Sequence, residues 1–281
     1  MITVTAATGQ LGRLVIEALL ARVPAEDITA AVRSPENAAD LAARGVRVVR
    51  ADYNDADSLK AAFAGTDRLL VISGNEFGQR VEQYQRIIDA AKAAGVGFVA
   101  YTSILRADEN PMYLAQDHKA AERLIEGSGI AHAFLRNGWY SENFAGAIQG
   151  AAAEGRMAAA AGEGRISSAP RADYAEAAAV VLTEAREGVF ELGGSDSFTL
   201  PELAGIVAGA ADRKVDFAAM TPEAYAEMLK GAGVPDGFAD ILADSDRYAA
   251  EGWLETRSRD LEDLLGRATV PMRETVAALL A

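Results

Sequence analysis

The first 140 residues alternate between short apolar runs and longer alanine-rich segments with a helical period. The short runs are candidate strands, at residues 2–6, 28–32, 46–50, 68–72, 98–102 and 131–135. Helical patterns separate them, including those at residues 11–21, 59–64 and 81–94. Strands that alternate with helices predict βαβ units and a parallel sheet, and right-handed crossovers place helices on both faces. The pattern therefore predicts an α/β fold with a doubly wound parallel sheet.

The rhythm changes after about residue 140, where strand-like runs become rarer. The remaining pattern predicts an alanine-rich segment at 147–161, a helix at 172–185, a strand at 189–192, helices from Thr199 and Thr221, a loop at 233–237 and a helical final segment. We expect residues 1–140 to form one domain and residues 141–281 a smaller, mostly helical lobe on the substrate side. This lobe is discontinuous, because the strand near Val189 is expected to return to the main sheet.

The composition excludes several classes of function. The formal net charge is −14, with 27 basic and 41 acidic residues. Such a surface repels a phosphate backbone, so we expect no nucleic-acid partner. The chain has no cysteine, which excludes disulfides, thiolate metal sites and a cysteine nucleophile. No cluster of His, Asp and Glu has the spacing of metal ligands, and we predict no metal site.

The start of the chain bears on its location. Residues 1–5 run directly into a glycine turn without a basic and apolar leader. This start predicts no signal peptide, and the cytoplasm is the expected location. The sequence contains no uncharged stretch of about 18 apolar residues, so we expect no membrane span.

A glycine turn separates the first predicted strand from the first predicted helix. It consists of Ala6, Ala7, Thr8, Gly9, Gln10, Leu11 and Gly12. Gly9 lets the backbone approach a pyrophosphate, and Gly12 lets the helix pack close to the sheet. The helix N-terminus then offers N–H groups and a partial positive charge to the phosphates. The turn indicates a Rossmann-type dinucleotide-binding domain over residues 1–140; a strand–helix turn without a ligand is the competing interpretation.

Arg33 follows the second predicted strand, where NAD-dependent enzymes usually carry Asp or Glu to bind the ribose 2′-hydroxyl. A guanidinium instead offers a planar fork of donors to a 2′-phosphate. Arg33 therefore predicts NADP(H) as the cofactor, against the alternative of a solvated surface arginine. Asp52, after the third predicted strand, is placed to flank the adenine or else caps a turn.

Small residues follow the fourth predicted strand, at Ser73, Gly74 and Asn75. They let the backbone pass close to the cofactor's ribose, although a simple turn has the same composition. Ser103, near the end of the fifth predicted strand, is a further candidate for cofactor binding through a hydrogen bond from its hydroxyl.

The catalytic pattern of the short-chain dehydrogenases, Tyr-x-x-x-Lys, is missing. Tyr113, for example, is followed four places later by Asp117. The missing pair argues against ordinary ketone reduction. His118 lies near a predicted helix start and is a candidate for lining the ligand crevice. His132 lies within a predicted strand and is interpreted as structural.

A dense polar and aromatic segment follows the sixth predicted strand. It consists of Arg136, Asn137, Gly138, Trp139, Tyr140, Ser141, Glu142 and Asn143. Amides, aromatic rings and a glycine at the carboxyl end of a strand suit contacts with a nicotinamide or a substrate. The competing interpretation is a connecting loop whose aromatic side chains fill the interface between the two lobes.

Together these motifs resemble the NmrA-like branch of the atypical short-chain dehydrogenases. Within that branch the chain is similar to the bacterial NADPH-dependent quinone oxidoreductases, with the triphenylmethane dye reductases as near relatives. The resemblance covers nearly the whole chain, and residues 136–143 carry it most specifically. The family usually has glycine where this chain has Ala6, and this departure bears on cofactor affinity.

The resemblance implies a set of cofactor contacts, a substrate pocket between the lobes and often a homodimer. The implied contacts with NADPH are the glycine turn, Arg33, the loop of residues 73–75 and the segment of residues 137–142. The leading hypothesis is hydride transfer from NADPH to a quinone, which already is a strong acceptor and needs only one further proton. Tyr140, Asn143 and His118 are the candidate pocket residues.

Two other functions stay open at this point. One is the reduction of another conjugated acceptor, such as a cationic dye or an enone. The other is a regulator that senses NADP(H) without turnover, because the NmrA-like branch resembles such regulators too.

Overall fold

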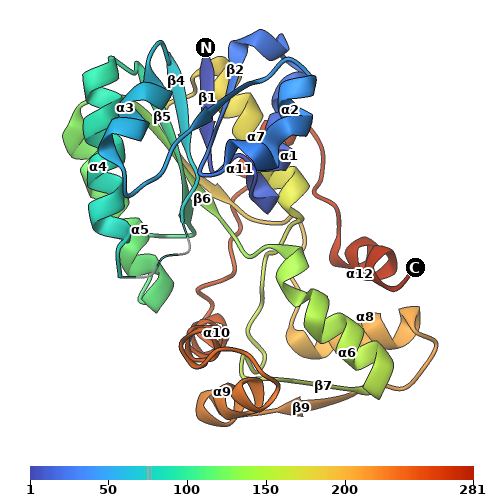
Figure 1. Ribbon diagram of the computed structural model, residues 1–281. Coiled ribbons are helices and arrows are strands. Elements are labelled where there is room, and N and C mark those ends of the chain that lie inside the picture. Colours follow the sequence, from blue (N-terminus) through green and yellow to red (C-terminus); the bar gives the residue numbers. More distant parts are fainter. Residues whose placement is uncertain (75, 77) are drawn as a thin grey trace. The chain divides into compact units, whose positions relative to one another are not determined.

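The computed structural model describes residues 1–74, 76 and 78–281. The chain divides into two compact units, each assembled from separate stretches of sequence (Figure 1). Unit 1 comprises Met1–Ile104, Asp117–Arg136 and Arg171–Phe190. Unit 2 comprises Leu105–Gln116, Asn137–Pro170 and Glu191–Ala281.

Unit 1 is built on a 7-stranded sheet with the order β3-β2-β1-β4-β5-β6-β8. The strands are β1 (Ile2–Thr5), β2 (Ile28–Val32), β3 (Arg47–Arg50), β4 (Arg68–Val71), β5 (Phe98–Ile104), β6 (Ala131–Asn137) and β8 (Gly188–Leu192). β1 pairs in parallel with both β2 and β4, so that Val4 lies opposite Ala30 and Leu70. Every residue of β1, β2 and β5 is buried, as expected for strands covered on both faces.

Helices cover both faces of this sheet (Figure 1). Those of unit 1 are α1 (Gln10–Leu20), α2 (Ala39–Ala43), α3 (Ala56–Phe63), α4 (Arg80–Ala94), most of α5 (Tyr113–Ser128) and α7 (Arg171–Glu184), with short 3-10 turns η1 (Ala25–Asp27) and η2 (Pro35–Ala38). α3, α4 and α5 enclose a core that includes Leu59, Phe63, Ile87, Val99 and Ile125. α1 and α7 pack together. The doubly wound α/β fold predicted from the sequence is confirmed.

The two units do not follow a single boundary at residue 140. α7 comes after that residue but packs along α1, and most of β8 also belongs to unit 1. The strand near Val189 thus lies in the main sheet, beside β6. Residues 105–116 group with unit 2, where the Tyr113 N–H donates to Asp244 Oδ2 at 2.9 Å. A long-range contact of this kind leaves no periodic signal in the sequence.

Unit 2 is mostly helical. Its elements are η3 (Ser141–Phe144), α6 (Ala145–Glu154), β7 (Arg156–Ala159), α8 (Leu200–Ala210), β9 (Asp216–Ala219), α9 (Pro222–Gly231), α10 (Asp236–Ala250), α11 (Asp260–Leu265) and α12 (Met272–Leu280). α6 packs against α8 and α12, and α9 packs against α10. β7 and β9 form a small parallel sheet that the alanine-rich sequence did not predict. Within the described parts of the chain, none of the helices has the length and apolar character needed to cross a membrane.

Candidate functional site

The candidate cofactor site of unit 1 lies where the sheet order reverses. β1 stands between β2 and β4, so the chain leaves β1 and β4 in opposite directions. In parallel sheets this switch point opens a crevice at the carboxyl ends of the strands, where ligands bind. The glycine turn follows β1, Arg33 follows β2 and Ser73 follows β4. The topology therefore brings these predicted residues to one edge of the sheet.

The glycine turn has the geometry of an anion site. The Gly9 N–H donates to Ala6 O at 2.9 Å, and Gly9 is the N-cap of α1. No side chain caps α1 and its first turn contains no acidic residue, so nothing there repels a phosphate. A Cβ on Gly12 would lie 2.3 Å from Ala6 O, which explains why glycine is required there. These features fit the pyrophosphate of a dinucleotide.

Ala6 holds a strained backbone conformation in this turn. Its φ is +48°, in the left-handed region that glycine adopts readily and residues with a Cβ do not. The departure noted in the sequence therefore has a physical meaning beyond the size of the methyl group. The chain folds with alanine at a position whose backbone geometry favours glycine.

We expect Ala6→Gly to stabilise the protein by about 1 kcal/mol, because relief of left-handed strain exceeds the added freedom of the unfolded chain. NADPH affinity should also rise, since the turn no longer resists the conformation that receives the pyrophosphate. Urea unfolding and a fluorescence titration with NADPH measure the two effects. Ala7→Gly is the matched control and should destabilise, because the buried Ala7 has no positive φ to relieve. Equal effects of the two substitutions would contradict the strain argument.

Arg33 is paired with a residue that the sequence analysis missed. Its Nη1 donates to Glu76 Oε1 at 3.0 Å, while its side chain remains 72% exposed. Glu76 Oε2 also accepts from Gln83 Nε2 at 2.7 Å and from Asn54 Nδ2 at 3.3 Å. The guanidinium is thus presented at the edge of the sheet, but beside a carboxylate. Glu76 lies only three residues after Ser73, and no local motif marks it.

The neighbouring predicted residues have structural contacts. Asp52 Oδ1 accepts from the Asn54 N–H at 2.9 Å, which is the turn-capping interaction left open by the sequence. The Ser73 N–H donates to Thr102 Oγ1 at 2.9 Å and ties the end of β4 to β5. A Cβ on Gly74 would lie 3.8 Å from the nearest neighbouring atoms, so packing does not require a glycine at this position. Asn75 lies outside the described residues.

Ser103 belongs to a buried network of charged and polar groups. Its Oγ donates to Glu122 Oε1 at 2.6 Å. Glu122 also accepts from Arg136 Nε at 3.0 Å and Arg136 Nη2 at 2.7 Å. Because the Ser103 proton points to this carboxylate, the lone pairs of its oxygen are what remain for a ligand. Ser103 is therefore better suited to accept a hydrogen bond than to donate one, contrary to the expectation from the sequence.

His118 is buried between β5 and α5. Its Nδ1 is hydrogen-bonded to Tyr101 Oη at 2.9 Å, and the two rings are in contact. Burial lowers the pKa of His118 to about 3, and positive Arg80 acts in the same direction. The imidazole is consequently neutral at pH 7. A catalytic role for His118 remains a proposal, and it must start from this neutral, hydrogen-bonded ring.

Unit 2 contains most of the polar segment, from Asn137, the last residue of β6, to Asn143. Asn137 Nδ2 donates to Tyr140 Oη at 3.1 Å. Asn137 Oδ1 is buried and accepts no hydrogen bond from the described residues. An unpaired buried acceptor of this kind costs free energy unless a ligand supplies a donor. The carboxamide of a nicotinamide carries such a donor, so Asn137 fits the predicted cofactor.

The backbone of the same segment is held firmly. The Gly138 N–H donates to Leu192 O at 2.7 Å, and Trp139 O accepts from the Ala169 N–H at 3.3 Å. Ser141 Oγ and Ser168 Oγ lie 3.0 Å apart in a hydrogen bond. The Asn143 N–H donates to Tyr140 O at 3.0 Å, while Glu142 lies in the first turn of η3. The candidates Tyr140 and Asn143 are thus brought together on one short turn.

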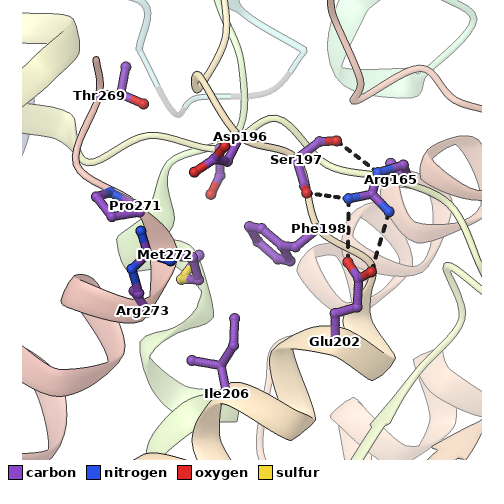
Figure 2. A pocket seen from close by; sticks show the side chains of 11 residues that line it. Arg165, Asp196, Ser197, Phe198, Glu202, Ile206, Thr269, Pro271, Met272 and Arg273 are labelled. Carbon is purple, nitrogen blue, oxygen red and sulfur yellow. Dashed lines mark hydrogen bonds and ion pairs between the residues drawn. The ribbon is translucent and has the colours of Figure 1, made fainter. Parts of the chain in front are cut away.

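Unit 2 also contains a cavity of about 310 Å³, shown in Figure 2. Its lining is Arg165, Ser168, Asp196, Ser197, Phe198, Glu202, Ile206, Thr269, Pro271, Met272 and Arg273. Arg165 is held within the protein, because its Nε donates to Ser197 Oγ at 2.8 Å and its Nη2 lies 3.4 Å from Glu202 Oε2. Glu202 in turn completes the capping box of α8. These charges are structural, and none of the predicted catalytic residues lines this cavity.

Comparisons of the sequence and of the structure with known proteins both find NAD(P)H-binding proteins and reductases. Residues 6–185 match the model of a family described as NAD(P)H-binding. The chain is 47% identical to quinone oxidoreductase 2 of Escherichia coli over 99% of this chain and 98% of that protein. It is similar to the solved structure of the Escherichia coli NADPH-dependent quinone oxidoreductase complexed with NADPH, with a TM-score of 0.98, 46% identity and full coverage (100%) of both chains. The Citrobacter triphenylmethane reductase complexed with NADP(H) has a TM-score of 0.94 and 38% identity, over 99% of this chain and 100% of that chain.

Proposed function

The chain belongs to the NAD(P)H-binding family, and we propose that it is an NADPH-dependent oxidoreductase that reduces quinones. One observation carries this proposal: the similarity to the Escherichia coli quinone oxidoreductase extends over nearly the whole chain at 47% identity. The residues of both units fit the cofactor. The glycine turn would hold the pyrophosphate, Arg33 the 2′-phosphate, and Asn137 the nicotinamide carboxamide.

When bound, NADPH supplies a hydride to the acceptor. The protein's own contribution is binding, orientation and exclusion of water, because a quinone is a strong acceptor without further activation. Formation of the quinol also needs one proton. Tyr140, Asn143 and His118 are the proposed pocket residues, and Tyr140 Oη accepts a hydrogen bond from Asn137 Nδ2 at 3.1 Å.

The direct test is the loss of NADPH absorbance on addition of a panel of benzoquinones and naphthoquinones. We expect oxidation that depends on the quinone, and slower oxidation with NADH, because NADH lacks the phosphate that Arg33 would bind. Tyr140→Phe should lower turnover and also weaken NADPH binding, because it removes the hydroxyl that accepts a hydrogen bond from Asn137. Tight NADPH binding without oxidation by any acceptor would instead support the regulator that senses NADP(H).

The similarity to a triphenylmethane reductase favours one second candidate, the reduction of cationic dyes. Turnover of triphenylmethane dyes and quinones under the same conditions separates the two, with the higher kcat/KM identifying the preferred acceptor. The proposal further includes an NADP-binding domain at residues 1–140 and a discontinuous substrate-side lobe at 141–281, part of which returns to the main sheet. It also includes a homodimer and a cytoplasmic location. Gel filtration with light scattering tests the homodimer, and cell fractionation tests the location.

A further inference from the structure

We propose that Glu76 determines cofactor specificity by competing, as an internal carboxylate, with the 2′-phosphate of NADP(H) for Arg33. The inference rests on the proposed function, because it takes Arg33 as the group that receives that phosphate. It goes further by assigning a role to a residue that carries the same charge as the ligand. Its basis is the 3.0 Å contact between Arg33 Nη1 and Glu76 Oε1.

Glu76 is held in place by more than a surface ion pair. Gln83 projects from α4, is only 2% exposed, and donates from Nε2 to Glu76 Oε2 at 2.7 Å. Asn54, from the loop after β3, donates to the same oxygen at 3.3 Å. Gln83 Nε2 also lies 3.3 Å from Asn54 Oδ1, which couples the two amides. The carboxylate is therefore fixed by donors from separate elements, independently of Arg33.

Arg33 is less constrained than its partner. Its side chain is 72% exposed, against 40% for Glu76, and the contact with Glu76 uses one of its five N–H groups. The rest of the planar fork is available to a phosphate. A phosphate that reaches this fork must therefore come close to the fixed carboxylate of Glu76.

Glu76 is expected to affect the binding of the two cofactors in opposite directions. A 2′-phosphate and the Glu76 carboxylate repel each other, so Glu76 weakens the binding of NADPH. The 2′-hydroxyl of NADH has no charge and can donate a hydrogen bond to a carboxylate. Glu76 thus narrows the preference for NADPH that Arg33 creates. It also eases release of NADP⁺ after turnover, because the carboxylate is ready to pair with Arg33 again.

The test is Glu76→Gln, which keeps an oxygen that accepts from Gln83 and Asn54 and removes the charge. Titration with NADPH and NADH, without any acceptor, measures binding apart from turnover. We expect NADPH affinity to rise about three- to tenfold and NADH affinity to stay the same or fall. The gain should shrink as ionic strength rises. A thermal melt followed by circular dichroism verifies that the variant is folded.

Two controls separate a local effect from a general change of charge. Glu82→Gln removes the same charge at a residue of α4 that pairs with Arg86 instead, and should leave both affinities unchanged. In an Arg33→Ala background, Glu76→Gln should improve NADPH binding by less than in the wild type, because the contested group is gone. An unchanged or weaker NADPH affinity in Glu76→Gln would overturn the inference, as would equal gains in both backgrounds. Intact nucleotide binding without quinone turnover would overturn the proposed function alone.

Discussion

Arg33→Ala is expected to weaken NADPH binding by about 10- to 100-fold, the range for loss of charge-assisted hydrogen bonds to a phosphate. Glu76, held by Gln83 and Asn54, already competes for this guanidinium, so part of what Arg33 offers to the phosphate is offset in the wild type. The same substitution should therefore cost more NADPH affinity in a Glu76→Gln background than in the wild type. NADH has no such phosphate, so its affinity should change much less.

Fluorescence titration of both nucleotides measures this change in preference directly. Arg47→Ala is a suitable control. Arg47 carries the same charge and is exposed, but it is the first residue of β3 and so lies at the amino ends of the strands, whereas Arg33 lies at their carboxyl ends. A general loss of positive charge would affect NADPH binding equally in the two variants. An Arg33→Ala protein with an unchanged NADPH-to-NADH preference would remove the 2′-phosphate role from Arg33. The Glu76 inference would then fail with it.

The sequence could predict those parts of the fold that depend on local pattern. β2 coincides with the predicted strand at 28–32, and α1 begins within the glycine turn as its spacing implies. The prediction succeeded here because buried parallel strands are continuous apolar runs and their helices are periodic. It failed for β7 and β9, where short alanine-rich segments lack either signal.

The candidate site divides in the same way. Arg33 and the glycine turn are recognisable because their chemistry follows directly from a strand end. Glu76 and Glu122 were missed because each acts through a partner distant in sequence. Glu122 did leave a trace, since it lies four residues after His118 and therefore on the same face of α5. Polar residues on the buried face of a predicted helix therefore indicate buried polar interactions even when they belong to no known motif.

Glu122→Ala is expected to lower the free energy of unfolding by about 3–5 kcal/mol, because it removes one member of a buried ion pair together with two hydrogen bonds to the Arg136 guanidinium. Both partners lie in the interior: the side chains of Arg136 and Glu122 are 9% and 6% exposed. The substitution also frees the hydroxyl hydrogen of Ser103, which now points to Glu122 Oε1 at 2.6 Å. In that variant Ser103 can donate to a ligand, so a change in NADPH affinity should accompany the loss of stability.

The matched control is Glu126→Ala, one turn further along α5 at an exposed glutamate, where the expected change is within about 0.5 kcal/mol. Urea unfolding of both variants measures the difference. Replacing both partners, in Glu122→Leu with Arg136→Met, should recover much of the lost stability, because the buried carboxylate and the buried guanidinium are then removed together. Equal effects of Glu122→Ala and Glu126→Ala would mean that Arg136 finds another partner or water. In that case the buried pair would contribute little to stability, and Ser103 would not depend on it for its orientation.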